Sequence, residues 1–240
     1  ISFLNILESI RNTKKKITTI MITSDKCYLN IEKKGGYREN ERMGGDENYS
    51  ASKASCEILF NSYFKSYFLK NKKIKIATAR AGNVIGGGDW SKNRLVPDII
   101  RSLNNNKILN VRSLKSTRPW QHVLEPLSGY INLAVNLNKN KKINGQSFNF
   151  GPKTRNYTVE EVLNKFKASY KNLNWKKMTR EKFKETKLLN LNCNKIKKMT
   201  NWQPKLNFHQ TMHKTIEWYN SFNKDQNITN QQIMEYFNEK

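Results

Sequence analysis

The chain has 240 residues, enough to bury a substantial core in one or two domains. It carries 44 Lys and Arg residues against 19 Asp and Glu, a formal net charge of +25 at pH 7. We find no apolar run long enough to span a bilayer and no signal peptide, so we expect no membrane partner.

The basic residues are scattered along the chain among many Asn and Ile residues. A charge of this size raises the possibility of a nucleic acid or an anionic membrane as partner. The sequence shows no zinc finger, RNA-binding motif or arginine-rich segment, and the codons of Lys, Asn and Ile are all rich in A and T. We therefore attribute the charge to codon usage and expect no nucleic-acid partner, although a basic surface would attract an anionic small molecule.

Three cysteines, Cys27, Cys56 and Cys193, lie far apart in the sequence. An odd number at such spacing fits neither a disulfide framework nor a metal site. We expect reduced thiols in or near the core of a cytoplasmic protein, and no bound metal.

The first elements predict a parallel α/β arrangement. Residues 1–12 have apolar side chains at helical spacing, and residues 17–22 are mostly apolar or β-branched, as in a buried strand. A long polar loop follows over 28–48, and loops at the carboxyl ends of such strands build the ligand crevice. We predict a helix over 51–70 and a second parallel strand over 72–78.

The later part of the chain predicts further helices and a return to the sheet. Residues 147–151 predict a strand that closes the sheet, and Thr158 with Glu161 forms a helix-capping pattern. Residues 171–187 are rich in Lys with little periodicity and predict a mobile surface loop. The other predicted elements are helices from 95, over 122–137, 193–199, 208–222 and 231–237, and short strands over 108–111 and 188–191.

Tyr49 and Lys53 lie four positions apart where the helix over 51–70 begins, so a helix would place both on one face. An ammonium group beside a phenol favours the phenolate, which makes Tyr49 a candidate base for a sugar hydroxyl. The spacing alone is weak evidence, because an exposed Tyr near a solvated Lys gives the same pattern. Its context strengthens it, since residues 23–26 end the predicted strand and a Gly pair at 44–45 precedes the Tyr.

Five stretches carry a longer pattern: residues 23–28, 36–40, 49–53, 79–90 and 118–127. Together they resemble the nucleotide-sugar 4,6-dehydratases of the extended short-chain dehydrogenase/reductase family. The last two stretches are long and specific, and the resemblance extends over nearly the whole chain.

The resemblance implies a Rossmann-like, doubly wound parallel sheet with a smaller, interleaved substrate-binding domain. Residues 1–85 would be the carboxyl-terminal half of the dinucleotide-binding domain, and 86–240 mainly the nucleotide-sugar domain, with 146–151 returning to the sheet. In the family, a Gly-rich loop that holds the cofactor pyrophosphate comes earlier. No such loop precedes residue 23, and the Gly run at 86–88 is better explained as a flexible crossover, so we expect the amino-terminal half to be missing.

The resemblance also implies an activity. This is the NAD-dependent dehydration of CDP-glucose to CDP-4-keto-6-deoxyglucose by a hydro-lyase, for deoxysugars of surface polysaccharide. Oxidation at C4 acidifies the C5 proton, an acid protonates the departing C6 hydroxyl, and the hydride returns to C6. NAD is the implied cofactor, a nucleotide sugar the implied substrate, and a homo-oligomer the implied assembly.

The same pattern assigns roles to residues. Tyr49 would take the O4 proton, Lys53 would assist it and bind the cofactor ribose, Ser24 would hydrogen-bond O4, and Asp25 would be the acid at C6. Lys26 replaces a Glu base at C5. An amine acts as a base only when neutral, so Lys26 either serves as that base, stabilises the enolate or pairs with Asp25. The implied contacts to the nucleotide diphosphate and sugar are Asn83, Arg94, Leu95, Arg118 and Asn149.

Simpler explanations stay open for some of these residues. Asn83, at a strand end, could bond only its own loop. The Arg118 fork suits a diphosphate, but it could instead stack on Trp120. We expect His122 to be structural rather than catalytic.

Other functions also stay open. An epimerase of the same family would share Tyr49 and Lys53 but lack the Asp25–Lys26 pair. If 240 residues are the whole gene product, the absent loop predicts weak NAD binding and an inactive protein. A basic nucleic-acid-binding protein is the least favoured alternative.

Overall fold

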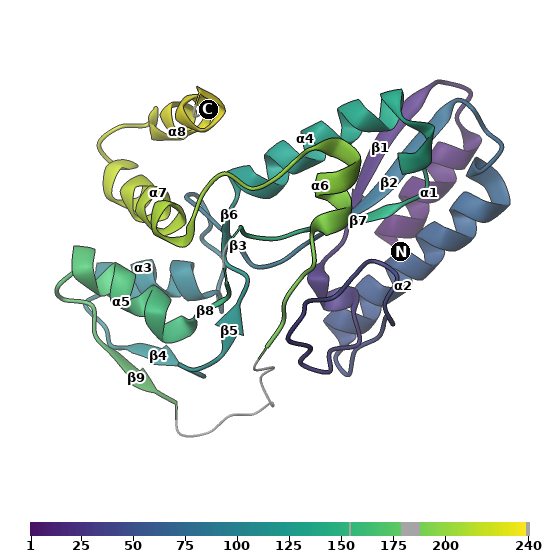
Figure 1. Ribbon diagram of the computed structural model, residues 1–240. Helices are drawn as coiled ribbons and strands as arrows, with labels where there is room; N and C mark the ends of the chain where they lie inside the picture. The colour runs from purple at the N-terminus through teal and green to yellow at the C-terminus, as the bar shows by residue number, and fades with distance from the viewer. Residues whose placement is uncertain (154, 179–187, 239–240) are drawn as a thin grey trace. The chain divides into compact units, whose positions relative to one another are not determined.

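The computed structural model describes residues 1–153, 155–178 and 188–238, which fold as two units (Figure 1). Unit 1 comprises Ile1–Gly82, Pro126–Gly151 and Leu189–Pro204. Unit 2 comprises Asn83–Glu125, Pro152–Leu188 and Lys205–Lys240. Each unit is therefore assembled from segments that are far apart in the sequence.

A parallel three-stranded sheet forms the centre of unit 1, in the order β1-β2-β7. Its strands are β1 (Ile17–Ile22), β2 (Ile74–Ala81) and β7 (Ser147–Phe150). All of β7 and most of β2 are buried, as expected for parallel strands with helices on both faces. The predicted strands over 17–22 and 147–151 and their parallel direction are confirmed.

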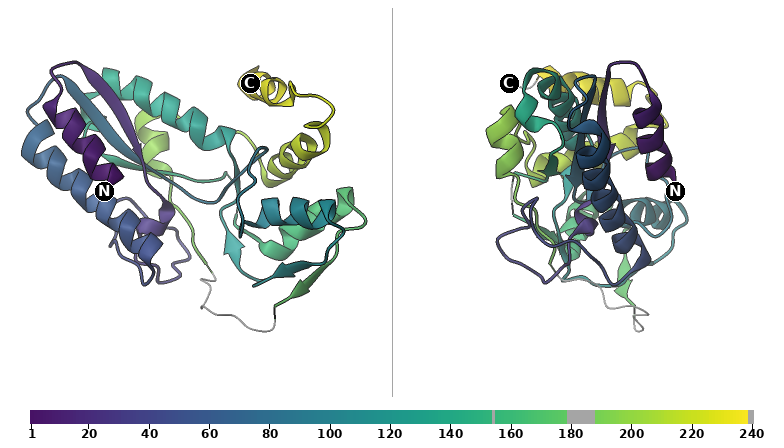
Figure 2. Two further views of the ribbon diagram at one scale, coloured as in Figure 1. Left: turned by 180° about the vertical axis from the view of Figure 1, so that it is seen from behind. Right: turned by 90° about the vertical axis from the view of Figure 1, so that its right-hand side faces the viewer.

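Helices cover both faces of this sheet (Figures 1 and 2). One face carries α1 (Ser2–Asn12) and α2 (Asn48–Tyr63), which continues as a π-helical turn over Phe64–Phe68. The other face carries α4 (Leu124–Lys139) and α6 (Asn194–Thr200), and short 3-10 turns form η1 (Asp25–Cys27) and η3 (Lys141–Ile143). The core on the α1–α2 face contains Leu7, Ile10, Met21, Phe60, Phe68, Ile74 and Ile76. The core on the α4–α6 face includes Leu133, Leu137, Phe148, Phe150, Ile196 and Trp202.

The face of β2 that meets α2 changes from apolar to polar along the strand. Side chains alternate between the two faces of a strand, so Ile76, Thr78 and Arg80 all point to the same side. Ile76 packs with Phe60 of α2 in the apolar core, whereas Thr78 and Arg80 hydrogen-bond Glu57, one helical turn earlier. The helix and the strand are thus matched in polarity along their contact.

Unit 2 combines paired short strands with helices around a separate core. The helices are α3 (Leu95–Asn104), α5 (Val159–Ser169), α7 (Phe208–Ser221) and α8 (Ile228–Asn238). The parallel pairs are β3 (Val84–Ile85) with β6 (Gln121–His122) and β4 (Leu109–Val111) with β9 (Trp175–Lys177); the antiparallel pair is β5 (Thr117–Arg118) with β8 (Tyr157–Thr158). The predicted capping pattern is confirmed, because Thr158 and Glu161 exchange both bonds of a capping box at the start of α5.

Two expectations about loops need correction. Trp175–Lys177, predicted to lie in a mobile loop, form β9 and pair with β4, while residues 179–187 of that loop lie outside the described residues. The Gly run at 86–88, predicted to be a flexible crossover, is tightly packed. A Cβ atom at Gly87 would lie 1.9 Å from the indole ring of Trp218, so the close approach of α7 requires glycine there.

The units also differ in extent from the predicted domains. The first stretch of unit 1 ends at Gly82 rather than at residue 85, and α4 from Pro126 onward belongs to unit 1. The reason is that α4 packs Leu133 and Leu137 against Phe148 of the sheet. Among the described residues, none of the helices combines the length and apolarity that a membrane span requires.

Candidate active site

The carboxyl end of β1 leads into a buried turn that carries Ser24, Asp25 and Lys26. Ser24 has an extended backbone, and its Oγ accepts a hydrogen bond from the Lys26 amide at 3.2 Å and donates one to Asp25 Oδ1 at 3.0 Å. Ser24 and Asp25 are only 8% and 4% exposed, and Lys26 is half-buried. The turn therefore holds the Ser24 hydroxyl and the Asp25 carboxylate side by side.

Tyr49 and Lys53 share one face of α2, as the spacing predicted. The Lys53 ammonium lies 5.5 Å from the centre of the Tyr49 ring, and the Tyr49 side chain is 51% exposed. A phenol in this position can meet a ligand without any rearrangement of the core. The ammonium can contact both the phenol and a ligand beside it.

The start of α2 is held close to the turn at the end of β1, because η1 packs directly against α2. The chain enters α2 through Gly45, where a Cβ atom would lie 2.2 Å from the Ser50 Cβ. Only glycine fits this approach, so the Gly pair noted in the sequence serves to bring the chain tightly against the first turn of α2. Unit 1 thereby brings the five predicted catalytic residues onto two elements that touch.

A buried polar network lies beneath these elements. We call it the Glu57–Arg80 network; its members are Thr23, Tyr28, Glu57, Thr78, Arg80, Ser147 and Asn149. Glu57 and Arg80 are both fully buried and form an ion pair at 2.7 Å. The Glu57 carboxylate also accepts hydrogen bonds from three hydroxyl groups, those of Thr23, Thr78 and Ser147.

These contacts determine the charge of Glu57. Burial alone would raise the pKa of the Glu57 carboxyl, but the hydrogen bond and positive charge of Arg80, with hydrogen bonds from Thr23 and Thr78, outweigh it. The pKa of Glu57 is therefore lowered from its ordinary value, and the pKa of the Arg80 guanidinium is raised. Both groups stay charged at neutral pH, so the network contains a permanent ion pair.

Asn149, a predicted ligand contact, is a member of this network. Its Oδ1 accepts from the Tyr28 hydroxyl at 2.7 Å, and its amide group donates to the carbonyls of Tyr37 and Asn192 at 2.8 and 3.2 Å. The residue is completely buried. These bonds fasten β7 to neighbouring loops and engage the side-chain amide of Asn149 as a donor to two carbonyls.

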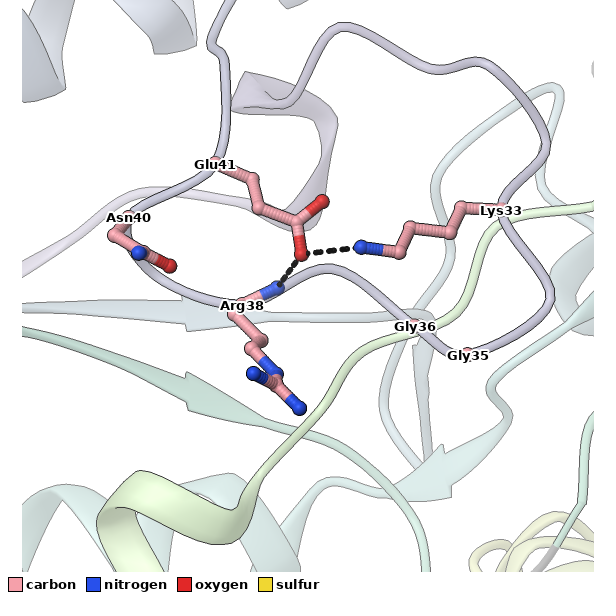
Figure 3. A pocket seen from close by; sticks show the side chains of 6 residues that line it. All are labelled: Lys33, Gly35, Gly36, Arg38, Asn40 and Glu41. Atoms are coloured by element: carbon pink, nitrogen blue, oxygen red, sulfur yellow. Dashed lines mark hydrogen bonds and ion pairs between the residues drawn. The ribbon is translucent and has the colours of Figure 1, made fainter.

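The loop over 28–48 contains an open pocket lined by Lys33, Gly35, Gly36, Arg38, Asn40 and Glu41 (Figure 3). Glu41 Oε1 accepts from Lys33 Nζ at 2.7 Å and from the Arg38 amide at 3.0 Å, and these bonds lower the pKa of the Glu41 carboxyl. Figure 3 shows the carboxylate between the two donors, with the Arg38 guanidinium directed away. The carboxylate thus fixes the shape of the loop tip.

The other predicted binding residues lie in unit 2. Asn83 is half-buried, and its carbonyl accepts from the Gln121 amide beside β3. Arg94 is exposed and stands immediately before α3, which Leu95 begins. Arg118 is 7% exposed in β5, where its guanidinium donates to the Thr117 carbonyl at 2.8 Å. Arg94 is therefore the one of these four side chains that is openly accessible within unit 2.

The remaining polar groups singled out by the sequence have structural surroundings. Burial raises the pKa values of the Cys27 and Cys193 thiols to about 12, and all three cysteines are free. Burial also lowers the pKa of His122 to about 4, with a smaller contribution from the charge of Lys214, so this imidazole is neutral at physiological pH. The described residues contain no group of His, Cys, Asp and Glu side chains able to hold a metal ion.

Sequence reasoning missed the Glu57–Arg80 network, although two signals pointed to it. Glu57 interrupts the buried face of α2 between Ala54 and Phe60, and Arg80 interrupts the apolar run of a buried parallel strand. Charged residues are almost never fully buried unless they are paired. Two such interruptions in neighbouring elements therefore predict a partner for each other.

Comparison with known proteins gives the class of this protein. Residues 1–215 match the family model described as GDP-mannose 4,6 dehydratase, and the chain therefore belongs to that family. The resemblance drawn from the sequence motifs is thus confirmed.

Individual members of the family and solved structures are similar to most of the chain. The chain is 38% identical over 224 residues to a CDP-glucose 4,6-dehydratase from Salmonella typhimurium. The matched region covers 91% of this chain but only 62% of that protein. A solved dTDP-glucose 4,6-dehydratase from Bacillus anthracis in complex with NAD matches at 21% identity and a TM-score of 0.77, over 95% of this chain and 70% of that one. An epimerase from Methanothermobacter thermautotrophicus matches at 18% identity and a TM-score of 0.79, over 95% and 66%. These structures confirm the predicted Rossmann-like fold.

Proposed function

We propose that the protein catalyses the NAD-dependent dehydration of CDP-glucose to CDP-4-keto-6-deoxyglucose, in deoxysugar biosynthesis. The observation that carries the proposal is that η1, with its Ser24–Asp25 pair, packs against the helix that presents Tyr49 and Lys53. The similarity to the Salmonella typhimurium CDP-glucose 4,6-dehydratase supports the choice of substrate.

The residues of unit 1 divide the work between two elements. Tyr49, exposed on α2, would take the proton from O4, and Lys53 beside it would stabilise the resulting charge. Ser24 would hydrogen-bond O4: its proton is directed to Asp25, and its oxygen can still accept from a sugar hydroxyl. Asp25, in its protonated form, would deliver a proton to the C6 hydroxyl as it leaves and become the carboxylate. Lys26 would act at C5, as the base or as a positive charge that stabilises the enolate.

The residues present also fit a nicotinamide cofactor. Tyr49 and Lys53 are both accessible, and an ammonium and a phenol together can hold the two hydroxyls of a ribose. The chemistry that bound NAD would supply is reversible hydride transfer with the sugar. In unit 2, we propose that Arg94 and Arg118, with Asn83 and Leu95, contact the nucleotide diphosphate and sugar; paired hydrogen bonds from an Arg suit a diphosphate.

The full gene product should be incubated with CDP-glucose and NAD and the product analysed by mass spectrometry. Dehydration predicts a product lighter by one water, with a 4-keto group. A product of unchanged mass that differs in the configuration at C4 would identify an epimerase instead. Unchanged substrate would refute both.

Two variants test the assignment of roles. Asp25→Asn should still oxidise C4 but lose water about 10²- to 10⁴-fold more slowly, because one general acid has been removed from that step. The variant should therefore accumulate reduced cofactor, seen by its near-ultraviolet absorbance. Tyr49→Phe should form no reduced cofactor, since the first step fails. Equal loss in both variants, without reduced cofactor, would show that Asp25 is needed earlier.

A further inference from the structure

We propose that the Glu57–Arg80 network is a positioning device that fixes the Ser24–Lys26 turn relative to Tyr49 and Lys53. The importance of those residues for catalysis rests on the proposed function. The placement itself is a structural claim that can be tested separately.

The network forms hydrogen bonds with the residues on both sides of the catalytic turn. Thr23, immediately before Ser24, donates from Oγ1 to Glu57 Oε1 at 2.5 Å. Tyr28, immediately after η1, accepts from the Arg80 guanidinium at 2.8 Å. Because Glu57 and Arg80 are bonded to each other, the residues that flank the turn are tied to one ion pair.

The same ion pair is part of the helix that carries Tyr49 and Lys53. Glu57 follows Lys53 by four residues and Tyr49 by eight, so the three lie on successive turns of α2, with Glu57 buried and Tyr49 exposed. A helix is stiff over two turns, and a displacement of Glu57 would therefore move Tyr49 and Lys53 with it. The Glu57 carboxylate thus joins the helix directly to the end of β1.

The two oxygens of this carboxylate have separate partners. Oε2 accepts from Thr78, Ser147 and Arg80 at 2.9, 3.0 and 2.7 Å, which anchors α2 to β2 and β7. Oε1 accepts from Thr23, the residue that leads into the turn. Loss of the Thr23 hydroxyl would therefore remove the direct bond between the helix and the residue before the turn, and leave the anchoring of the helix to β2 and β7 in place.

The free energy of folding alone does not explain why the Glu57–Arg80 ion pair is buried. Desolvation of two buried charges offsets most of their attraction, and apolar replacements of similar volume are often no less stable. Charge-assisted hydrogen bonds, in contrast, are short and directional and impose one geometry on their partners. A site that must hold two elements in register benefits from that property, since misplacement of reacting groups by about 1 Å can slow a reaction 10²-fold.

The test compares Thr23→Val with Thr78→Val in the full gene product. Each change keeps the side-chain shape and removes one hydroxyl from the same buried carboxylate, but only Thr23 adjoins the turn. The first readout is kcat and KM for CDP-glucose with NAD. The second is hydrogen exchange at the amides of Lys26, Cys27 and Tyr28, which are bonded within the turn.

We expect Thr23→Val to lower kcat by about 10- to 100-fold with little change in KM, and to speed exchange in the turn. Thr78→Val should lose comparable thermal stability, but Ser147 and Arg80 still hold Glu57 Oε2, so its kcat should fall less than that of Thr23→Val and its exchange in the turn should stay near wild type. Thr23→Ser, which keeps the hydroxyl, should restore both values. If Thr23→Val does not fold, Tyr28→Phe tests the other end of the turn with the same expectation.

Equal effects of Thr23→Val and Thr78→Val on both readouts, or no effect of Thr23→Val on exchange, would overturn the proposal. A wild-type protein without dehydratase activity would refute the proposed function instead. The exchange comparison would then still decide whether the network positions the turn.

Discussion

Each unit contains a fully or almost fully buried glutamate that joins distant segments, and the two are held in different ways. Glu57 in unit 1 pairs with the Arg80 guanidinium at 2.7 Å and accepts three hydroxyl hydrogen bonds. Glu125 in unit 2, in the first turn of α4, accepts from the amides of Lys205 and Leu206 and from the Tyr236 hydroxyl.

The pKa values of the two carboxyl groups are therefore shifted in opposite directions. Burial raises the pKa of the Glu125 carboxyl, and its hydrogen bonds and the charge of Lys205 only partly counter this. At Glu57 burial acts in the same direction, but Arg80 and the hydroxyl donors reverse it, and the pKa is lowered. At Glu57 the directly bonded Arg80 cation and the hydroxyl donors together favour the ionised carboxylate in spite of its burial.

The largest effect should come from Glu57→Gln. This change leaves the Arg80 guanidinium buried without its counter-charge, which typically lowers the free energy of unfolding by about 3–5 kcal/mol. Urea unfolding, followed with hydrogen exchange in β2 and α2, would measure it. Adding Arg80→Met to the same protein removes the stranded charge and should recover part of the loss. A loss of the same size in the double variant would show that the charge itself is not the cause.

Glu125→Gln should lower the free energy of unfolding by less than Glu57→Gln does. The amide keeps one acceptor oxygen but turns a donor toward groups that are donors themselves, and an unsatisfied buried group typically costs about 1–3 kcal/mol. Hydrogen exchange at Leu206 and along α8 reports on this site. A loss as large as that of Glu57→Gln would break the contrast between the two glutamates.

The contrast also predicts opposite pH dependences, measured as the gap in unfolding free energy between wild type and each Gln variant. The folded-state pKa of Glu125 is raised, so its contribution is fully present below the unfolded pKa and is lost as pH rises through the folded value. As pH falls from about 7 toward 5, the free energy of unfolding of the wild type should therefore rise relative to that of Glu125→Gln. The folded-state pKa of Glu57 is lowered. The difference in unfolding free energy between wild type and Glu57→Gln should therefore stay constant over that range and shrink only below the ordinary pKa value of 4.5. Parallel curves for both variants would contradict this.

The smallest effect should come from the exposed Lys33–Glu41 pair. Its two side chains are 41% and 23% exposed, and ion pairs of this kind contribute about 0.2–1 kcal/mol. Lys33→Ala should lower unfolding free energy by no more than that, and added salt should reduce the difference. Lys34→Ala, at the neighbouring position, is the matched control and should change little.

Several elements of both units could be predicted because local patterns specify them. Residues 17–22 read as a strand because their side chains are apolar and β-branched, and Thr158 with Glu161 marked the start of α5 through a pattern only four residues long. The spacing of Tyr49 and Lys53 likewise fixed their common face. In each case the information lies within one element.

The Glu57–Arg80 network and strand β9 were not predicted because their causes lie far apart in the sequence. Ser147 meets Glu57 only after two strands and a helix have been placed, and no local pattern records that meeting. Trp175–Lys177 become a strand because they pair with β4, not because of their own composition. Asn149 was assigned to a ligand by resemblance alone, and no local pattern indicates the hydrogen bonds that its amide makes to the carbonyls of Tyr37 and Asn192.

The three consecutive glycines at 86–88 would ordinarily be taken as a hinge, yet the absence of a side chain at Gly87 serves the opposite purpose. The indole of Trp218 fills the place where a methyl group would be, and its Nε1 donates to Thr229 near the start of α8. A single added methyl, as in Gly87→Ala, would push the indole aside and disturb the attachment of the last helix. Gly87 thus makes room for the side chain that links α7 to α8.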